Sequence, residues 1–216
     1  MLKVTHLSDT HGRHENVEEL PAGDILIHSG DATNLGTFKE AEYFFEWFNN
    51  RPFNHKIFVP GNHDFLFEES KTNWEDLLDE NTYVLINDSI VIEGILFHGV
   101  SYQPAFLHWA FNLGEPDLQK EWEKIPDDVD VLITHSPPFG ILDKNSFFEN
   151  CGSKSLFDKI SKLKNLKANL FGHIHEDAGD KIINEVLYIN ASFLENGIKT
   201  NPVRNFLLNK KKALIF

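Results

Sequence analysis

The sequence is poor in residues that cross-link or anchor a chain. It has a single cysteine among 216 residues, which excludes an internal disulfide and argues against a disulfide-stapled secreted domain. No uninterrupted apolar run approaches the roughly 18 residues that a membrane-spanning helix needs. Basic residues are also scarce, since 20 lysines and arginines stand against 33 acidic residues and leave a net charge of −13. Such a surface repels phosphate backbones, so we expect no stable complex with nucleic acid.

Features of a multidomain or exported protein are missing as well. There is no glycine- and serine-rich linker, no low-complexity segment and no internal repeat. A length of 216 residues suits one large domain, and we expect a single domain over residues 1–216. The chain starts directly with a predicted strand, without a basic-then-apolar signal segment, so we predict a cytoplasmic protein with no membrane association. The sequence leaves the oligomeric state open.

Short apolar runs predict buried strands. These runs are Leu2–Leu7, Ile25–His28, Lys56–Val59, Val129–Thr134 and Ala168–Phe171. Each run leads directly into a polar motif, which is typical of strands that end at a functional site.

Three segments have the periodicity of amphipathic helices. They are the segment after the Thr37–Glu40 capping box, Asp117–Ile125 and Ser153–Leu163. The stretch Tyr83–Phe97 instead predicts three strands in a meander, and Phe206–Phe216 predicts a hairpin. Strands that alternate with helices early and dominate later indicate an α/β protein, with two mixed sheets packed face to face and helices outside.

The polar motifs are rich in side chains that bind metals. They are Asp9-Thr10-His11, Gly30-Asp31, Gly61-Asn62-His63-Asp64, His135 and Gly172-His173-Ile174-His175. In open α/β sheets ligands gather at the carboxyl ends of strands, so we expect the motifs to meet there. Imidazole, carboxylate and amide donors without thiolate suit two divalent ions, drawn from Mn, Fe, Zn, Ni or Mg.

The spacing within a motif predicts where its side chains point. Asp9 and His11 are two residues apart, and residues i and i+2 of an extended segment point the same way, so both can reach one ion. His173 and His175 have the same spacing and can reach one ion each. Asp31 carries two carboxylate oxygens, so it can bridge the two ions.

The third motif adds a predicted catalytic group. Asn62 offers a neutral oxygen to an ion, and His63, the next residue, is expected to point elsewhere and to take part in the chemistry. Asp64 can orient the His63 ring and raise its basicity. Asn62 and His63 are also expected to contact the substrate, and Arg13 and His14 of the first loop are further candidates for this role. Other histidines that can approach a substrate are His55 and His108.

In this order the motifs resemble those of the calcineurin-like metallophosphoesterases. The likeness covers nearly the whole chain and extends to the branch that includes the vertebrate brain 239-type phosphodiesterases and bacterial relatives. The segments that carry it are Ser8–His11, Gly23–His28, Gly30-Asp31, Lys56-Ile57, Gly61–His63, Trp109–Leu113, Ile125-Pro126, Asp130–His135, Pro137-Pro138, Phe171–Glu176 and Tyr188–Ser192. The resemblance implies a four-layer α-β-β-α sandwich of two mixed sheets flanked by helices.

The resemblance also implies how the ligands divide between two ions. The first ion would take Asp9, His11, Asp31 and His175. The second would take Asp31, Asn62, His135 and His173. His63 matches the family's proton donor, whereas Asp64 stands where that branch often has glutamate. Some vertebrate members lack one histidine of the G-H-x-H motif, and this chain keeps both.

The implied activity is hydrolysis of a small phosphodiester or a cyclic nucleotide. A hydroxide held between two ions about 3.5–4 Å apart would attack phosphorus, and His63 would protonate the leaving oxygen. A phosphomonoesterase or a nuclease is the alternative among enzymes. A non-catalytic binding scaffold is the alternative outside enzymes, although such proteins usually lose ligands that this chain keeps. Trp109 and Phe111 either line a base-stacking pocket or cover the core, and the sequence leaves both open.

Overall fold

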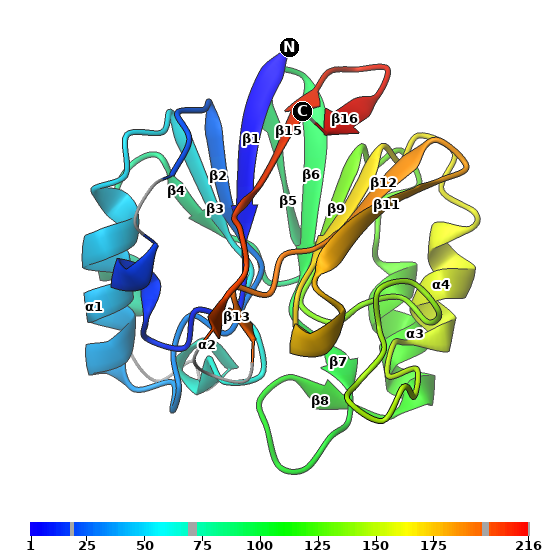
Figure 1. The fold of residues 1–216 in the computed structure, drawn as a ribbon, viewed down its shortest axis with the longest axis horizontal. Helices are drawn as coiled ribbons and strands as arrows, with labels where there is room; N and C mark the ends of the chain where they lie inside the picture. Colours follow the sequence, from blue (N-terminus) through cyan, green and yellow to red (C-terminus); the bar gives the residue numbers. More distant parts are fainter. Residues whose placement is uncertain (18–19, 69–72, 196–198, 216) are drawn as a thin grey trace.

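A computed structural model describes residues 1–17, 20–68, 73–195 and 199–215 of the chain. Two six-stranded sheets pack face to face, with α1 (Phe38–Asn49) outside one sheet and α3 (Glu115–Glu123) and α4 (Lys154–Ile160) outside the other (Figure 1). The predicted four-layer α-β-β-α architecture is confirmed.

The first sheet has the strand order β16-β15-β1-β2-β3-β4. Its strands are β1 (Leu2–Leu7), β2 (Ile25–His28), β3 (His55–Phe58), β4 (Thr82–Val84), β15 (Arg204–Leu208) and β16 (Ala213–Ile215). The strands β1 to β4 are parallel, and β15 and β16 form the predicted hairpin that pairs antiparallel with β1. Phe216, which the sequence assigns to that hairpin, lies outside the described residues. Because β1, β2 and β3 run parallel, the segments that follow these strands leave the sheet at the same edge.

The second sheet has the order β11-β12-β10-β9-β6-β5. Its strands are β5 (Asp88–Ile92), β6 (Ile95–Val100), β9 (Val131–Thr134), β10 (Ala168–Phe171), β11 (Gly179–Ile183) and β12 (Val186–Asn190). The four inner strands run parallel, and the two edge strands pair with them antiparallel. The segments after β9 and β10 thus also emerge together.

Several short elements complete the described structure. They are β7 (Gln103–Pro104), β8 (Asn112–Leu113), β13 (Leu194–Glu195), β14 (Lys199–Thr200), the helix α2 (Phe65–Glu68), and the 3-10 turns η1 (His14–Asn16), η2 (Trp74–Leu77) and η3 (His175–Asp177). In the described part of the chain, no helix is long and apolar enough to cross a membrane.

The core lies in three apolar layers. Between the sheets, the fully buried side chains include Ile27 and Ile57 of the first sheet and Val131 and Leu170 of the second. Burial of one such side chain contributes roughly 1.5–3 kcal/mol. The two outer layers lie under α1 and under the pair α3 and α4. Because one apolar layer is shared by both sheets, the sheets hold each other in place.

The helix α1 begins at the predicted capping box. The Thr37 hydroxyl accepts a hydrogen bond from the Glu40 amide, and the Glu40 carboxylate accepts one from the Thr37 amide. Such a cap satisfies amides that have no partner within the helix. The buried face of α1 presents phenylalanines, among them Phe44 and Phe45, to Phe58 of β3.

The meander predicted over Tyr83–Phe97 is wrong in its connectivity. Its first strand, β4, belongs to the first sheet, whereas β5 and β6 form a hairpin in the second. The chain crosses between the sheets before β5, through Asn87, whose φ of 56° turns the backbone. The hairpin turn itself uses positive φ at Glu93 and Gly94, as a type I′ turn requires. Strand-like patterning fixes the strands but does not say which sheet each one joins.

Candidate metal centre

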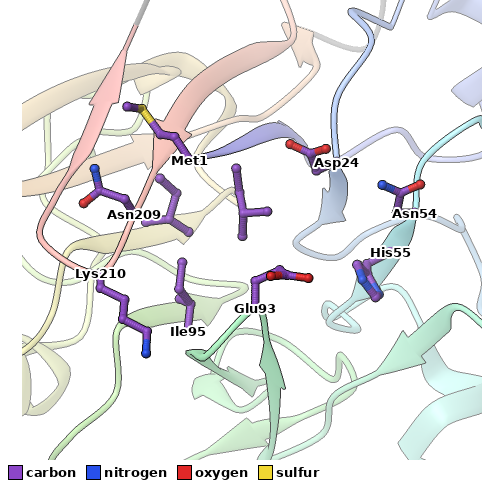
Figure 2. Close-up of a pocket in the computed structure, with 10 residues that line it drawn as sticks. Met1, Asp24, Asn54, His55, Glu93, Ile95, Asn209 and Lys210 are labelled. Carbon is purple, nitrogen blue, oxygen red and sulfur yellow. The ribbon is translucent and has the colours of Figure 1, made fainter.

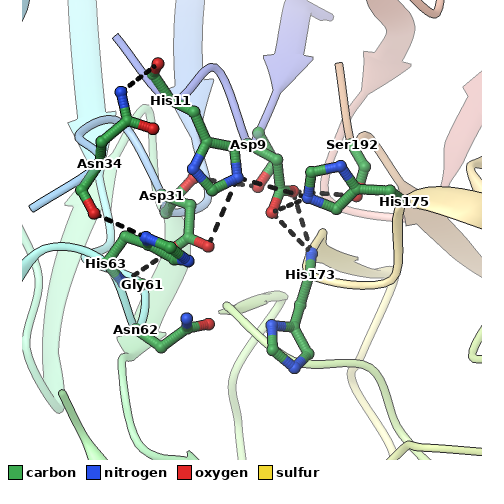
Figure 3. Close-up of polar contacts among 12 residues, drawn as sticks. Asp9, His11, Asp31, Asn34, Gly61, Asn62, His63, His173, His175 and Ser192 are labelled. Atoms are coloured by element: carbon green, nitrogen blue, oxygen red, sulfur yellow. Dashed lines mark hydrogen bonds and ion pairs between the residues drawn. The ribbon is translucent and has the colours of Figure 1, made fainter. Parts of the chain in front are cut away.

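The five polar motifs meet at one place in the folded chain. They follow β1, β2, β3, β9 and β10, whose carboxyl ends lie at the same edge of the two sheets. Figure 3 shows Asp9, His11, Asp31, His173 and His175 gathered there. Among the described residues, three groups of donor atoms lie close enough together to hold a metal ion, and all three are built from these motifs.

The first group contains Asp9, His11 and His175, whose donor atoms lie within 4.8 Å of one another. The Nε2 atom of His175 lies 3.3 Å from an Asp9 oxygen and 3.4 Å from Nε2 of His11. Two imidazole nitrogens that face each other at this distance need either a shared proton or a shared cation between them. The donor set therefore fits a divalent ion.

The second group contains Asp31, His135 and His173. The Nε2 atom of His135 lies 3.4 Å from Oδ1 of Asp31 and 3.0 Å from Oδ1 of Asn62. Its other nitrogen, Nδ1, lies 2.9 Å from the Ser29 carbonyl, to which it donates. This bond directs Nε2 toward the Asp31 and Asn62 oxygens, so a proton or a metal ion must lie between these acceptors, which is the arrangement of a metal ligand.

Asp31 connects the two groups. Its Oδ1 atom faces His135, and its Oδ2 atom lies 3.8 Å from Nε2 of His11. The same carboxylate also belongs to a third group, with His11 and His63. Asp31 is thus placed to share its two oxygens between neighbouring ions.

Several of these side chains extend from backbone in the left-handed region. The φ angles are 56° at Asp9, 43° at His11, 55° at Asp31 and 71° at His173. The strand β1 ends at Leu7, so the expected extended alternation of Asp9 and His11 is wrong, although both join one group. Non-glycine residues adopt this conformation at a cost of about 1–3 kcal/mol, and such strain clusters at functional sites.

Two glycines allow the loops to pack this closely. A Cβ atom on Gly30, whose φ is 107°, would overlap the His135 ring and the Gly61 backbone. A Cβ atom on Gly172 would overlap the Asp9 carboxylate. Only glycine leaves room for these approaches of backbone to ligand side chain.

The electrostatics of the centre favour carboxylates and imidazoles in ionic contact. Burial opposes ionisation of Asp9, but its hydrogen bond with His175 and the nearby histidines hold its pKa well below the usual value. Burial also opposes protonation of His135, yet the Asp31 carboxylate raises the pKa of His135 to about 9. Asp9 likewise raises the pKa of His175 to about 9. These groups attract positive charge, which a divalent ion supplies more effectively than protons.

His173 differs from the other histidines of the centre. Burial, together with the positive charge of His135, lowers the pKa of His173 to about 4. Its ring is therefore neutral, the form that binds metals. Its backbone amide donates to both oxygens of Asp9, at 3.1 and 2.9 Å, so the loop that carries His173 also orients a carboxylate of the first group.

Asp64 does not orient the His63 ring, which corrects the prediction from the sequence. Its carboxylate accepts hydrogen bonds from the amides of Asp31, Thr33 and Gly61 and from the Thr33 hydroxyl, at 2.8–3.0 Å. Burial and the negative charge of Asp31 raise the pKa of Asp64 to about 6. The side chain points into the backbone of two ligand loops and ties them together.

The His63 ring is instead held by Asn34 and Trp109. Its Nδ1 atom lies 2.7 Å from the Asn34 carbonyl, to which it donates, and its ring lies 3.9 Å from the Trp109 ring, centroid to centroid. Trp109 therefore lies beside the centre, while Phe111 is buried in the core. The sequence left open whether these aromatics line a pocket or cover the core, and the structure places Phe111 in the core and Trp109 against the His63 ring.

The further candidates for substrate contact lie in different environments. Arg13 is exposed on the turn after His11, where contact with a substrate stays a prediction. His14 is fully buried against Tyr43 and Trp47 of α1, so its expected substrate contact is wrong.

His55 is also far from the motifs. It begins β3 at the amino end of the strand, whereas the motifs follow the carboxyl ends. Figure 2 shows it beside a pocket with Met1, Asp24, Glu93 and Lys210, at the opposite edge of the sheets. His108 is exposed in the loop between β7 and β8.

Some contacts of the centre come from groups outside the five motifs. The Ser192 hydroxyl donates to Asp9 at 2.9 Å, and the Ser29 and Asn34 carbonyls accept from His135 and His63. The sequence pointed to Ser192 alone among them, because Ser192 lies in Tyr188–Ser192, one of the segments that carry the family resemblance. Backbone carbonyls carry no residue-type signal, so only the fold reveals them.

Comparison with known proteins places the chain in a family. A relative from Homo sapiens, metallophosphoesterase domain-containing protein 1, is 34% identical over 211 residues, which cover 86% of this chain and 64% of that protein. A UPF0046 protein from Caenorhabditis elegans is 32% identical and covers 97% of this chain and 76% of the relative. The chain therefore spans less than two thirds of the human relative.

More distant relatives carry names of phosphodiesterases. A probable glycerophosphodiester phosphodiesterase from Arcobacter nitrofigilis is 28% identical, with 80% of this chain and 63% of that protein covered. A 3',5'-cyclic-nucleotide phosphodiesterase from Nostoc is 25% identical, with 76% and 60% covered.

The fold is found in solved structures, and the family pattern covers most of the chain. The crystal structure of a hypothetical protein from Thermus thermophilus has a TM-score of 0.53 at 12% identity, over 98% of this chain and 96% of that one. The sequence pattern described as calcineurin-like phosphoesterase matches residues 2–177, which include all five motifs. Together with the geometry of the centre, this match shows that the chain belongs to the calcineurin-like phosphoesterase family.

Proposed function

We propose that this chain is a dimetal-dependent phosphodiesterase that hydrolyses small diesters or cyclic nucleotides. The observation that carries the proposal is Asp31, whose two oxygens face His135 on one side and His11 on the other. A carboxylate shared in this way is the link that a two-ion phosphoesterase needs. Family membership supports phosphoesterase activity, and the shared carboxylate supports two ions over one.

The proposed ligand sets are those that the family resemblance implies, and two of the donor groups in the structure support them. The first ion would take Asp9, His11, Asp31 and His175, and the second would take Asp31, Asn62, His135 and His173. When bound, the two ions supply a water activated near neutral pH and positive charge for the phosphoryl oxygens. Asn62 is neutral, so the second set leaves more positive charge for an anionic substrate than a carboxylate in its place would.

The remaining residues orient these ligands and transfer a proton. Ser29 fixes the tautomer of His135, and Ser192 donates to Asp9. The Nδ1–H of His63 donates to the Asn34 carbonyl, so Nε2 is the atom that, in the doubly protonated imidazolium form of the ring, would give its proton to the leaving oxygen. This assignment of His63 as proton donor agrees with the geometry but rests on the family resemblance.

The preference for small diesters draws on the relatives and on charge. Two relatives are named as diester hydrolases, and the net charge of −13 disfavours long nucleic acids as substrates. A phosphomonoesterase or a nuclease remains the alternative that the assay must distinguish.

The test compares three substrates with each candidate metal added to metal-free protein. We expect hydrolysis of bis-p-nitrophenyl phosphate and of cyclic AMP to exceed that of p-nitrophenyl phosphate, to require metal, and to vanish in His135→Ala. A preference for the monoester would indicate a phosphomonoesterase. Absence of hydrolysis with every metal would contradict the proposal.

A further inference from the structure

His63 has two competing options in this structure. Its ring nitrogen belongs to a group with His11 and Asp31 whose donor atoms all lie within 4.8 Å, so the ring is close enough to become a metal ligand. An imidazole that binds a metal through Nε2 has no proton on that atom to give to a leaving group. Proton donation by His63 therefore requires contacts that keep its ring away from the first ion.

The contacts on His63 come from three sides. Nδ1 donates to the Asn34 carbonyl at 2.7 Å, and the Asn34 side chain donates to the His11 carbonyl at 2.9 Å (Figure 3). The His11 ring meets His63 edge to face, with centroids 4.7 Å apart and planes at 89°. The Trp109 ring lies against His63 at 3.9 Å with planes at 33°. Trp109 makes the closest of these ring contacts.

Trp109 is itself fixed to a ligand loop. The next residue, Ala110, is fully buried, and its amide donates to the Asn62 carbonyl at 3.0 Å. The Trp109 ring also lies 6.0 Å from the Phe65 ring. The loop between β7 and β8 contributes no ligand to the groups above, yet it is bonded to the residue before His63 and places an indole on the His63 ring.

We propose that Trp109 is a positioning residue that keeps His63 available as a proton donor by holding its ring away from the first ion. A single hydrogen bond through Nδ1 leaves the ring free to rotate about that bond, whereas a flat indole against one face fixes its plane. The effect on proton donation rests on the proposed function, but the effect on metal coordination does not.

The first experiment reads coordination without turnover. Metal-free wild type, Trp109→Ala and Trp109→Phe are titrated with Co²⁺, and the visible absorption of the bound ion reports its ligands. We expect Trp109→Ala to change the spectrum because His63 joins the ion, and Trp109→Phe to keep the wild-type spectrum because a flat ring remains. The change should disappear in the double variant Trp109→Ala/His63→Ala.

The second experiment reads the leaving group. In Trp109→Ala we expect kcat on cyclic AMP, whose leaving alkoxide needs a proton, to fall by about tenfold or more. On bis-p-nitrophenyl phosphate, whose leaving group departs readily, kcat should change far less, and KM should stay similar on both. Phe106→Ala, in the same loop with a side chain 58% exposed, is the matched control and should behave as wild type.

Equal cobalt spectra and an equal loss on both substrates in Trp109→Ala would overturn the proposal. A Trp109→Phe variant as impaired as Trp109→Ala would also overturn it. Should Trp109→Ala fail to fold, the comparison passes to Trp109→Leu, which is expected to show the same defects relative to Trp109→Phe. If the wild type hydrolyses no substrate, the proposed function fails, while the cobalt spectra still decide the role of Trp109.

Discussion

At the scale of single residues, the centre divides into side chains that face the metal positions and groups that orient them. The side chains that face the metal positions were predictable, because so many aspartate, histidine and asparagine residues directly after buried strands have few roles other than metal binding. The groups that orient them were not. Asp64 was expected to support His63, but its oxygens bond to the amides of Asp31 and Gly61. Its partners are backbone groups from two loops, which only the tertiary structure brings together.

The buried carboxylate of Asp64 gives the first residue-scale prediction. In Asp64→Asn an amide NH₂ replaces an oxygen that accepts backbone hydrogen bonds, so we expect a loss of about 1–3 kcal/mol in the free energy of unfolding. Metal affinity should fall as well, because the Asp31 loop loosens. Chemical denaturation and metal titration measure both. Asp127→Asn, whose side chain is 95% exposed, is the control, and equal stability of the two variants would contradict the role assigned to Asp64.

His63 gives the second residue-scale prediction. Loss of a general acid typically costs 10²–10⁴-fold, so we expect His63→Ala to lower kcat on cyclic AMP by about that factor. Metal content should be unchanged, since the proposed ligand sets do not include His63. Unchanged turnover would remove His63 from the mechanism, and loss of bound metal would make it a ligand instead.

At the scale of elements, local patterns predicted α1 better than they predicted the connections. The capping box of Thr37 and Glu40 lies within one turn of chain, so the sequence contains all of it. The crossing from β4 to β5 depends on which sheet offers a free edge, and no local pattern states that. The left-handed backbone at Asp9 and Asp31 is similarly fixed by contacts between loops.

The strand β2 ends in His28, a buried histidine packed between the sheet and α1. Its Nε2 atom lies 3.0 Å from the Thr10 hydroxyl, and its ring lies 5.0 Å from that of Phe44. Burial lowers the pKa of His28 to about 3 in the folded chain, against about 6.5 when unfolded. Below pH 6.5 the unfolded chain therefore binds a proton at His28 that the folded chain does not. The free energy of unfolding consequently decreases as the pH is lowered.

We expect this group to contribute a loss of up to about 1.4 kcal/mol per pH unit between pH 6.5 and pH 3. Urea unfolding of metal-free protein at several pH values measures the slope. His28→Phe cannot titrate and keeps a ring of similar size, so its slope over this range should be smaller than that of the wild type. Identical slopes would show that His28 is protonated in the folded chain.

At the scale of the whole molecule, the two sheets supply different parts of one centre. Asp9, Asp31 and Asn62 follow strands of the first sheet, whereas His135 and His173 follow strands of the second. The shared apolar layer between the sheets sets the distance between these groups. The sequence predicted the sandwich because its strands and helices are regular, and it predicted the meeting of the motifs because each one ends a strand.

The central claim is that this edge of the sandwich holds two ions joined by one carboxylate. The most direct test is the number of Mn²⁺ ions bound per chain, measured by equilibrium dialysis with elemental analysis, in wild type and in Asp31→Asn. We predict two ions per wild-type chain and weaker binding of both in the variant, because Asp31 serves both proposed ligand sets. One ion or none in the wild type, or two ions at unchanged affinity in Asp31→Asn, would contradict it.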